Sequence, residues 1–336
     1  MFRALLGRLV VGCALFFCLS GGAVAAHAQG EVVRLYDTEY VSATTFAAQA
    51  GLSRLWLVPQ KKLLLANKTL RLELEVDSRD FLLNGRRVFL GEPAVAYHQT
   101  IYISRIDRDR LLRPMVDSRQ IPGTVPGLRT IVIDPGHGGK DDGTVNSALK
   151  LKEKAMALDV ALRLERLLKA AGYRVALTRR NDTFIPLPLR PVFAKREKAD
   201  VFISLHFNAI DKRAITGNET FILTPQNQRS TEADHRQPDD ATRQPGNAVD
   251  GWNAVLGFWI HSALLGSLQS FDRGLKHARF AVLRDIECPG LLVECGYLSN
   301  DAEARKIATP EWRQKIAAAI AEGVAGYREA VVAAKH

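Results

Sequence analysis

The sequence predicts an α/β sheet covered by helices, preceded by a smaller β-rich part. From residue 130 onward, compact strand-like runs alternate with helical periodicity, which is typical of that architecture. Before residue 120 the runs are short, as in the strictly alternating "RLELEVD", and "LNGRR" (83–87) predicts a hairpin turn. Two Pro-Gly pairs in "IPGTVPGLR" (121–129) separate the two patterns. We therefore expect a small β-rich α+β domain over 30–120, a linker over 121–129 and an α/β domain over 130–332.

The first 28 residues have the pattern of a secretory signal peptide. Arg3 and Arg8 precede an apolar run over 9–19, and small residues then lead to the A-x-A sequence that ends at Ala28. The apolar run is short for a membrane span. We predict cleavage after Ala28, and therefore an exported protein of the periplasm or cell wall without a stable membrane span.

Charge and cysteine content narrow the expected partners. Removal of the leader would lower the formal net charge from +10 to +8 and leave two of the four cysteines, Cys288 and Cys295. Two cysteines do not make a disulfide scaffold, and the sequence leaves open whether they pair. The basic balance suits an anionic partner such as nucleic acid, a membrane surface or a cell wall, and export argues against nucleic acid.

Polar side chains stand at the ends of the predicted α/β strands. The strand-like runs are "TIVID", "YRVALT", "VFISLH", "TFIL" and "LLVE", and an amphipathic helix over 153–171 ends at Gly172. In open α/β sheets, sites form beyond the carboxyl ends of the strands. Those ends carry His206 and Glu294, with His137 in the Gly-rich turn that follows the first run.

One segment interrupts the alternation of strands and helices. Residues 225–250 are polar, contain prolines and have few large apolar side chains. This composition predicts a mobile surface loop inserted in the α/β domain.

His137, Glu153 and His206 each have a simple structural interpretation, but together they fit a metal site. A loop histidine is commonly incidental, a histidine that ends a buried strand is often a core residue, and a glutamate in a first helical turn suits the helix dipole. Two imidazoles and one carboxylate are nevertheless a standard ligand set for a catalytic zinc, which keeps a fourth position for water. Zinc lowers the pKa of that water and polarises a carbonyl.

Glu294 is the candidate proton carrier. A buried strand rarely finishes in an unpaired charge, and a carboxylate there could pass a proton from water to a leaving amine. The structural alternative is a salt bridge. Asn208 and Glu219 are candidates for orienting substrate or ligands, with plain structural roles as the alternative.

Three further residues are not expected to act in the site. Cys295 follows Glu294 and should point to the opposite side of the strand, where packing is its expected role. His261 and His277 are expected on the surface of helices.

Seven blocks of the sequence resemble, in order, the zinc-dependent N-acetylmuramoyl-L-alanine amidases. They are "IVIDPGHGG", a Glu-Lys pair opening the next helix, "TRRND", "ADVFISLHFNA", "GNETFIL", "DRGLKHARFAVLR" and "PGLLVECGYLSN", spread over about residues 130–327. The resemblance implies a mixed sheet flanked by helices, one zinc per chain held by His137, Glu153 and His206, and a catalytic glutamate at Glu294. It also implies hydrolysis of the amide between N-acetylmuramic acid and L-alanine in peptidoglycan.

The N-terminal part more weakly resembles the small stalk domain found at the N-terminus of copper amine oxidases. It holds no cluster of copper ligands in sequence, since His98 is isolated. The resemblance implies a targeting or spacing role.

Two other functions stay open at this point. One is a zinc peptidase acting on stem peptides, and the other is a non-catalytic peptidoglycan-binding protein, against which the presence of all four site residues argues. Peptidoglycan is the expected partner, and a protein activator is a further candidate.

Overall fold

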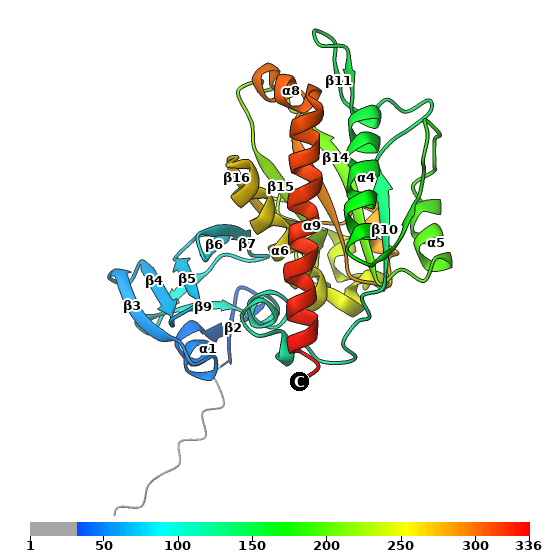
Figure 1. Ribbon diagram of the computed structural model, residues 1–336. Helices are drawn as coiled ribbons and strands as arrows, with labels where there is room; N and C mark the ends of the chain where they lie inside the picture. The colour runs from blue at the N-terminus through cyan, green and yellow to red at the C-terminus, as the bar shows by residue number, and fades with distance from the viewer. Residues whose placement is uncertain (1–31) are drawn as a thin grey trace, which may run out of the picture.

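The computed structural model describes residues 32–336, so the predicted signal peptide lies outside the described residues (Figure 1). Eleven strands form one mixed sheet that runs through both parts of the chain. Its α/β half has, in spatial order, β13 (Arg174–Leu177), β10 (Thr130–Pro135), β14 (Val201–Asn208), β17 (Gly290–Tyr297), β15 (Asn218–Leu223) and β16 (Asp272–Ala278).

Strand direction makes this half of the sheet mixed, as the sequence predicts. Strands β13, β10, β14 and β17 are parallel, whereas β15 runs antiparallel to β17 and parallel to β16. All five strand-like runs of the sequence are strands. β10 is buried along its whole length, because a central parallel strand is covered on both faces.

Helices cover the two faces of the sheet. Alternate residues such as Ile131, Ile203 and Val293 pack in the larger core with α4 (Glu153–Ala170), α6 (Asp250–Leu268) and α9 (Pro310–Ala333). Residues of the other face, such as Val132, Phe202 and Leu292, pack against α5 (Leu189–Arg196) and α7 (Ala281–Arg284). Helix α8 (Asp301–Ala308) follows β17, and the short hairpin β11 (Val145–Asn146) and β12 (Leu151–Lys152) precedes α4.

The N-terminal part continues the same sheet. Strand β7 (Arg86–Phe89) pairs with β16 through Val88 and Leu275, and a meander of β6 (Asp80–Leu83), β5 (Arg71–Glu75), β4 (Lys62–Ala66) and β3 (Ser53–Val58) completes it. The predicted turn of "LNGRR" joins β6 to β7, with Asn84 and Gly85 both at positive φ as this hairpin type requires.

A second sheet of four strands packs beside this meander. It has the order β1 (Val32–Leu35), β2 (Thr38–Ser42), β9 (Thr100–Ser104) and β8 (Val95–Tyr97). Helix α1 (Ala43–Gln49) follows β2, where the Ser42 hydroxyl accepts hydrogen bonds from two backbone amides of its first turn. Short helical turns over α2 (Arg105–Asp107), Arg108–Leu112, α3 (Arg113–Val116) and Ser118–Gln120 lead to residues 121–129, which have no helix or strand.

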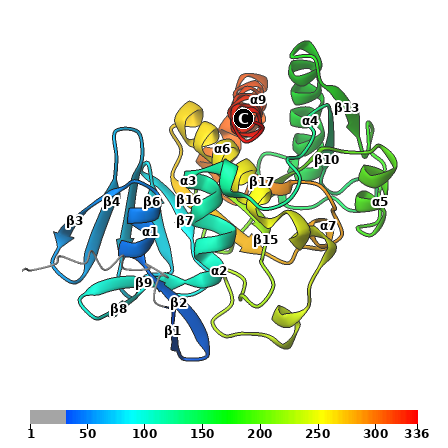
Figure 2. The ribbon, with the colours of Figure 1, turned by 90° about the horizontal axis from the view of Figure 1, so that it is seen from below.

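Figure 2 shows the two parts side by side, joined at β7 and β16. One buried hydrophobic cluster contains residues of both parts, including Val88 and Leu275. The division into independently folding domains stays a prediction.

The insert over 225–250 runs along the surface with many exposed residues, and its mobility stays a prediction. Gln228, Asp240 and Asn247 are buried, and two short 3₁₀ turns occupy Pro238–Ala241 and Pro245–Val249. The Arg79 guanidinium of the N-terminal part donates three hydrogen bonds of 3.1 Å to backbone carbonyls at residues 230, 231 and 233. These three carbonyls are therefore satisfied by the N-terminal part of the chain.

The placement of two histidines is corrected. His261 does lie on a helix, α6, but it is fully buried, with Nε2 2.9 Å from Asp272. His277 lies on strand β16 and is also buried. In the described part of the chain, no helix is both long and apolar enough to cross a membrane.

Candidate metal centre and catalytic site

The Gly-rich turn after β10 carries His137 in a left-handed backbone conformation, with φ of 59°. Nδ1 of His137 lies 2.9 Å from Asp141 Oδ2, and its Nε2 lies 3.0 Å from Glu153 Oε1. A carboxylate that accepts the Nδ1 proton fixes the ring and leaves Nε2 as the free ligand atom. A side chain at Gly136 would meet the His206 ring at 2.3 Å, so glycine is needed there for close approach.

Glu153 begins α4 and is almost fully buried. Its Oε2 accepts a hydrogen bond from the Thr144 amide at 2.8 Å, and its Oε1 accepts one from the Phe207 amide at 3.0 Å. These two backbone donors, from different segments, hold the carboxylate plane in place. Burial by itself would raise the pKa of Glu153, but the neighbouring imidazoles of His137 and His206 outweigh it and lower the pKa well below its usual range.

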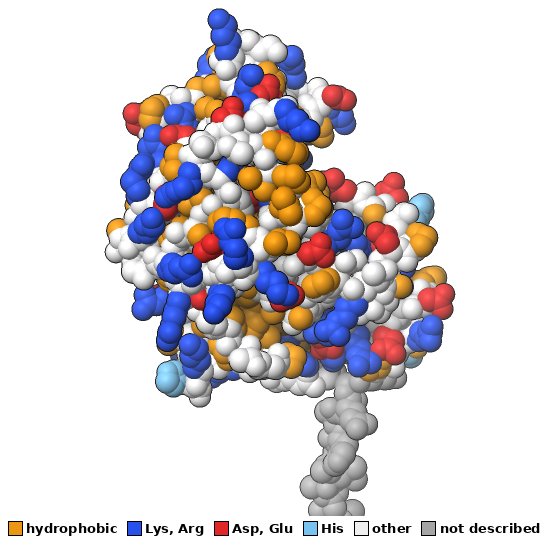
Figure 3. Space-filling view, turned by 90° about the vertical axis from the view of Figure 1, so that its right-hand side faces the viewer, with side chains coloured by type: hydrophobic (Ala, Val, Ile, Leu, Met, Phe, Trp, Pro, Cys, Tyr) orange, Lys and Arg blue, Asp and Glu red, His pale blue; other side chains and the backbone are white. Residues whose placement is uncertain are grey.

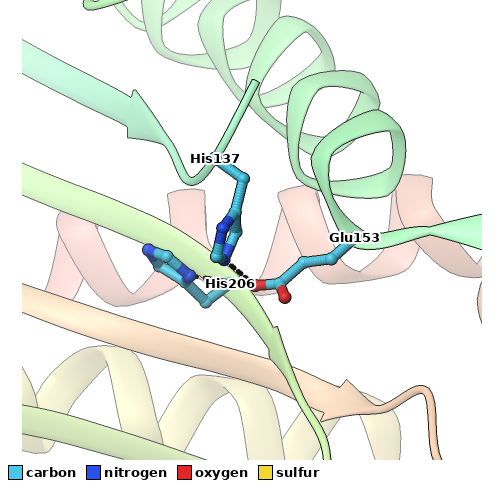
Figure 4. Close-up of side chains that lie close together, drawn as sticks. All are labelled: His137, Glu153 and His206. Carbon is cyan, nitrogen blue, oxygen red and sulfur yellow. Dashed lines mark hydrogen bonds and ion pairs between the residues drawn. The ribbon is translucent and has the colours of Figure 1, made fainter. Parts of the chain in front are cut away.

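His206 lies near the end of β14, beside β10 in the parallel sheet. Its Nδ1 lies 2.9 Å from Glu153 Oε1. One atom of each of His137, Glu153 and His206 lies within 4.8 Å of the others, and Figure 4 shows the three side chains pointing toward one another. The three predicted ligands therefore form one cluster. Burial acts to lower the pKa of His137, but the carboxylates of Glu153 and Asp141 reverse this and raise it, so the cluster has the negative field that favours a cation.

Two buried arginines hold the turn that carries His137. Arg190 Nη1 lies 2.7 Å from Asp134 Oδ1, and its Nη2 donates to the His137 carbonyl at 3.0 Å. Arg179 donates to the Gly136 carbonyl at 2.6 Å. Both guanidiniums satisfy carbonyls that the strained turn leaves without backbone partners. They belong to α5 and to the segment after β13.

Glu294 lies beside His206 across the β14–β17 ladder, where the two residues are register partners. Its Oε2 is buried and has no hydrogen-bond partner, and among residues 32–336 its carboxylate forms no ion pair. Burial raises the pKa of Glu294 well above its usual range, and the charges of Glu153 and Glu219 raise it further. The salt-bridge alternative for Glu294 is therefore not supported.

Asn208 and Glu219 contact each other at the far side of Glu294. Glu219 is the register partner of Glu294 on β15, is 1% exposed, and accepts from Asn208 Nδ2 at 2.5 Å. Cys295 packs in the larger core, on the opposite side of β17 as expected, and Cys295 and Cys288 are both free thiols.

Sequence reasoning missed Asp141, Arg179 and Arg190, although they touch the His137 turn. Asp141 could have been found, since it follows His137 by four residues in the same turn. The two arginines come from distant segments; Arg179 lies in the block "TRRND", but the sequence does not show that either side chain turns toward His137.

The family model described as N-acetylmuramoyl-L-alanine amidase matches residues 131–326. The chain belongs to this family. Its sequence is 33% identical over 237 residues to the N-acetylmuramoyl-L-alanine amidase AmiC of Escherichia coli O6:H1, a match that covers 64% of this chain and 57% of that protein. The chain spans about half the length of the curated relatives it matches.

Solved amidase structures resemble the α/β part. The N-acetylmuramoyl-L-alanine amidase from Clostridium difficile 630 aligns with a TM-score of 0.50 and 30% identity, over 60% of this chain and 97% of that one. The CwlD amidase from Clostridioides difficile, solved in complex with the GerS lipoprotein, aligns with a TM-score of 0.51 and 26% identity, over 60% of this chain and 98% of that one. The predicted family and the mixed, helix-flanked sheet are confirmed.

Proposed function

We propose that this amidase-family chain is a zinc-dependent hydrolase of peptidoglycan, cleaving the amide between N-acetylmuramic acid and L-alanine. The observation that carries the proposal is the position of Glu294. This unpaired buried carboxylate lies on the strand next to His206, beside a cluster of two imidazoles and one carboxylate.

The donor set supports zinc as the metal. Two histidine nitrogens and one carboxylate, with a carboxylate behind one histidine, are the ligands that catalytic zinc takes while keeping an open position. A zinc ion bound there supplies a Lewis acid, which acidifies a water and polarises the amide carbonyl.

The chain's own residues prepare and complete the reaction. Asp141 holds the proton on Nδ1 of His137, and the Thr144 and Phe207 amides orient the carboxylate of Glu153. Oε2 of Glu294 takes a proton from the attacking water and passes it to the leaving nitrogen of L-alanine. Burial and the charges of Glu153 and Glu219 raise the pKa of Glu294 and outweigh the opposing charge of Lys276, which favours proton uptake by this carboxylate.

Location and partners form part of the same proposal. The predicted signal peptide supports export, and the formal net charge of +8 that remains after its removal suits the carboxylates of a cell wall. Figure 3 shows Lys and Arg side chains spread over much of one face of the molecule. The lipoprotein complex of the CwlD amidase supports a protein activator for this chain as well.

The test is product analysis on purified peptidoglycan with the zinc-loaded protein. An amidase releases complete stem peptides with a free L-alanine amine and leaves bare muramic acid carboxylates. A peptidase instead shortens peptides that stay attached to the glycan, and a binding protein releases nothing.

A further inference from the structure

A buried lysine lies on β16, next to the strand β15 that carries Glu219. Lys276 of β16 is 8% exposed, and its Nζ lies 2.5 Å from Glu219 Oε2 and 3.0 Å from Glu232 Oε1. The ammonium also lies 5.5 Å from the centre of the Phe221 ring. Burying an unpaired ammonium costs folding free energy. The carboxylates that pair with Lys276 therefore show which groups its charge stabilises.

Both oxygens of Glu219 have polar contacts, of which those to Oε1 are hydrogen bonds and the one to Oε2 is an ion pair. Oε1 accepts hydrogen bonds from the Tyr297 hydroxyl at 2.6 Å and the Asn208 amide at 2.5 Å, while Oε2 pairs with Lys276. Among residues 32–336, Lys276 is the only lysine or arginine in ion-pair contact with Glu219. The lysine is therefore what compensates the charge of this enclosed carboxylate.

Asn208 and Tyr297, which donate to Glu219 Oε1, are the register partners that close an irregularity in the β14–β17 ladder. His206 pairs with Glu294, and the next paired positions are Asn208 and Tyr297, so β17 has one more residue than β14 over this stretch. Such a β-bulge re-aims side chains and is common beside active sites. Glu219 therefore accepts hydrogen bonds from both residues of the pair that closes the bulge, Asn208 and Tyr297.

We propose that Lys276 is a positioning residue for the catalytic glutamate. The ammonium of Lys276 fixes the position of Glu219 through their ion pair. Glu219 in turn binds both Asn208 and Tyr297 and so fixes the geometry of the bulge. The bulge determines how the Glu294 side chain is oriented beside His206. Lys276 itself does not touch substrate. The inference rests on the proposed amidase function, because it assigns a role in that reaction.

The second partner of Lys276 provides a matched control. Glu232 lies in the 225–250 insert, and its side chain is 73% exposed. An exposed carboxylate contributes little to an ion pair because water screens it. Glu232→Gln thus removes a contact to the same lysine without disturbing Glu219.

The experiment compares Lys276→Met, Lys276→Arg and Glu232→Gln in the full chain, assayed with zinc on a soluble muropeptide. Lys276→Met should lower kcat per zinc-loaded molecule by about 10–100-fold, with little change in KM. Loss of a residue that orients the groups of a metal site typically has an effect of this size. Lys276→Arg should recover part of the loss, and Glu232→Gln should match the wild type.

Tyr297→Phe is the second variant, and it needs no removal of a buried charge. It deletes one donor to Glu219, and kcat should fall in the same direction as in Lys276→Met. Wild-type kcat in Lys276→Met or in Tyr297→Phe would overturn the proposal, as would a loss that only follows zinc content or the folded fraction. Turnover of the wild-type protein in this assay tests the proposed amidase function. The ratio of kcat between each variant and the wild type tests the positioning role of Lys276.

Discussion

Glu294→Gln separates proton transfer from metal binding. The substitution keeps the size and nearly the shape of the side chain but cannot accept a proton from water. His137, Glu153 and His206 are untouched, so the protein should bind zinc as the wild type does. General acid–base groups typically contribute about 10²–10⁴-fold in rate, which corresponds to roughly 3–5 kcal/mol of activation free energy. We expect turnover to fall by that order.

The structure also predicts how the fold responds. Oε2 of Glu294 has no hydrogen-bond partner and its carboxylate forms no ion pair in the described chain, so the amide loses no contact. The change also removes the repulsion between Glu294 and the carboxylates of Glu153 and Glu219, which outweighs the attraction to Lys276 that is lost with it. The melting temperature of the metal-free variant should therefore equal or exceed that of the wild type.

The assay combines three measurements on one variant: zinc content, melting temperature and the initial rate of amide hydrolysis. Glu287→Gln is the control, because the Glu287 side chain is 58% exposed and, among residues 32–336, forms its one ion pair with the exposed Lys195. Near-normal turnover in Glu294→Gln would remove Glu294 from the mechanism and make Glu219 the next carboxylate to test. A lower melting temperature with turnover intact would restore the structural interpretation.

Three further predictions follow from the site and the fold. His137→Ala and His206→Ala should each lower zinc content and activity together, and full zinc content in both would show that the ligands are wrong. The fragment 130–336 should fold and hydrolyse soluble muropeptides but act less on whole sacculi; an unfolded fragment by circular dichroism would refute the domain division. Burial raises the pKa of Asp250 to about 7, against about 3.9 in unfolded chains, so stability should fall between pH 4 and pH 7 by up to about 4 kcal/mol. Urea unfolding should show this loss in Asp239→Asn but not in Asp250→Asn.

Folding promotes proton uptake by Asp250, and this uptake sets the direction of the pH dependence. Because the folded pKa is above the unfolded one, the folded state binds more protons between the two values, and raising the pH through this window favours unfolding. Asp239 is exposed and serves as the matched acid. Pairing of Asp250 with Arg110 or Arg243 strong enough to keep it ionised would give a flat profile instead.

The sequence predicted the metal cluster because parallel strands bring their carboxyl ends to one edge. His137 follows β10 and His206 ends the neighbouring β14, so their proximity is a consequence of strand order, and Glu153 begins the helix that follows the same turn. Glu294 was found for the same reason, since β17 is parallel to β14.

Other features depend on contacts between distant segments and had no local signal. β16 was not predicted because "DRGLKHA" mixes glycine with charged residues, and its burial of Lys276 and His277 depends on partners in β15 and the insert. The polar composition of the insert predicts a surface loop but does not show that Arg79, about 150 positions earlier, binds three of its carbonyls. The continuous sheet through β7 and β16 likewise joins segments that no sequence pattern connects.

The central claim is that the His137–Glu153–His206 cluster with Glu294 cleaves the bond between muramic acid and L-alanine. Its most direct test is mass analysis of the products that the zinc-loaded protein releases from purified sacculi, with a chelator-treated sample beside it. We predict complete stem peptides beginning with a free L-alanine amine and peptide-free glycan strands, both lost on chelation. Shortened stem peptides that remain attached to the glycan, or the same products after the metal is removed, would contradict the claim.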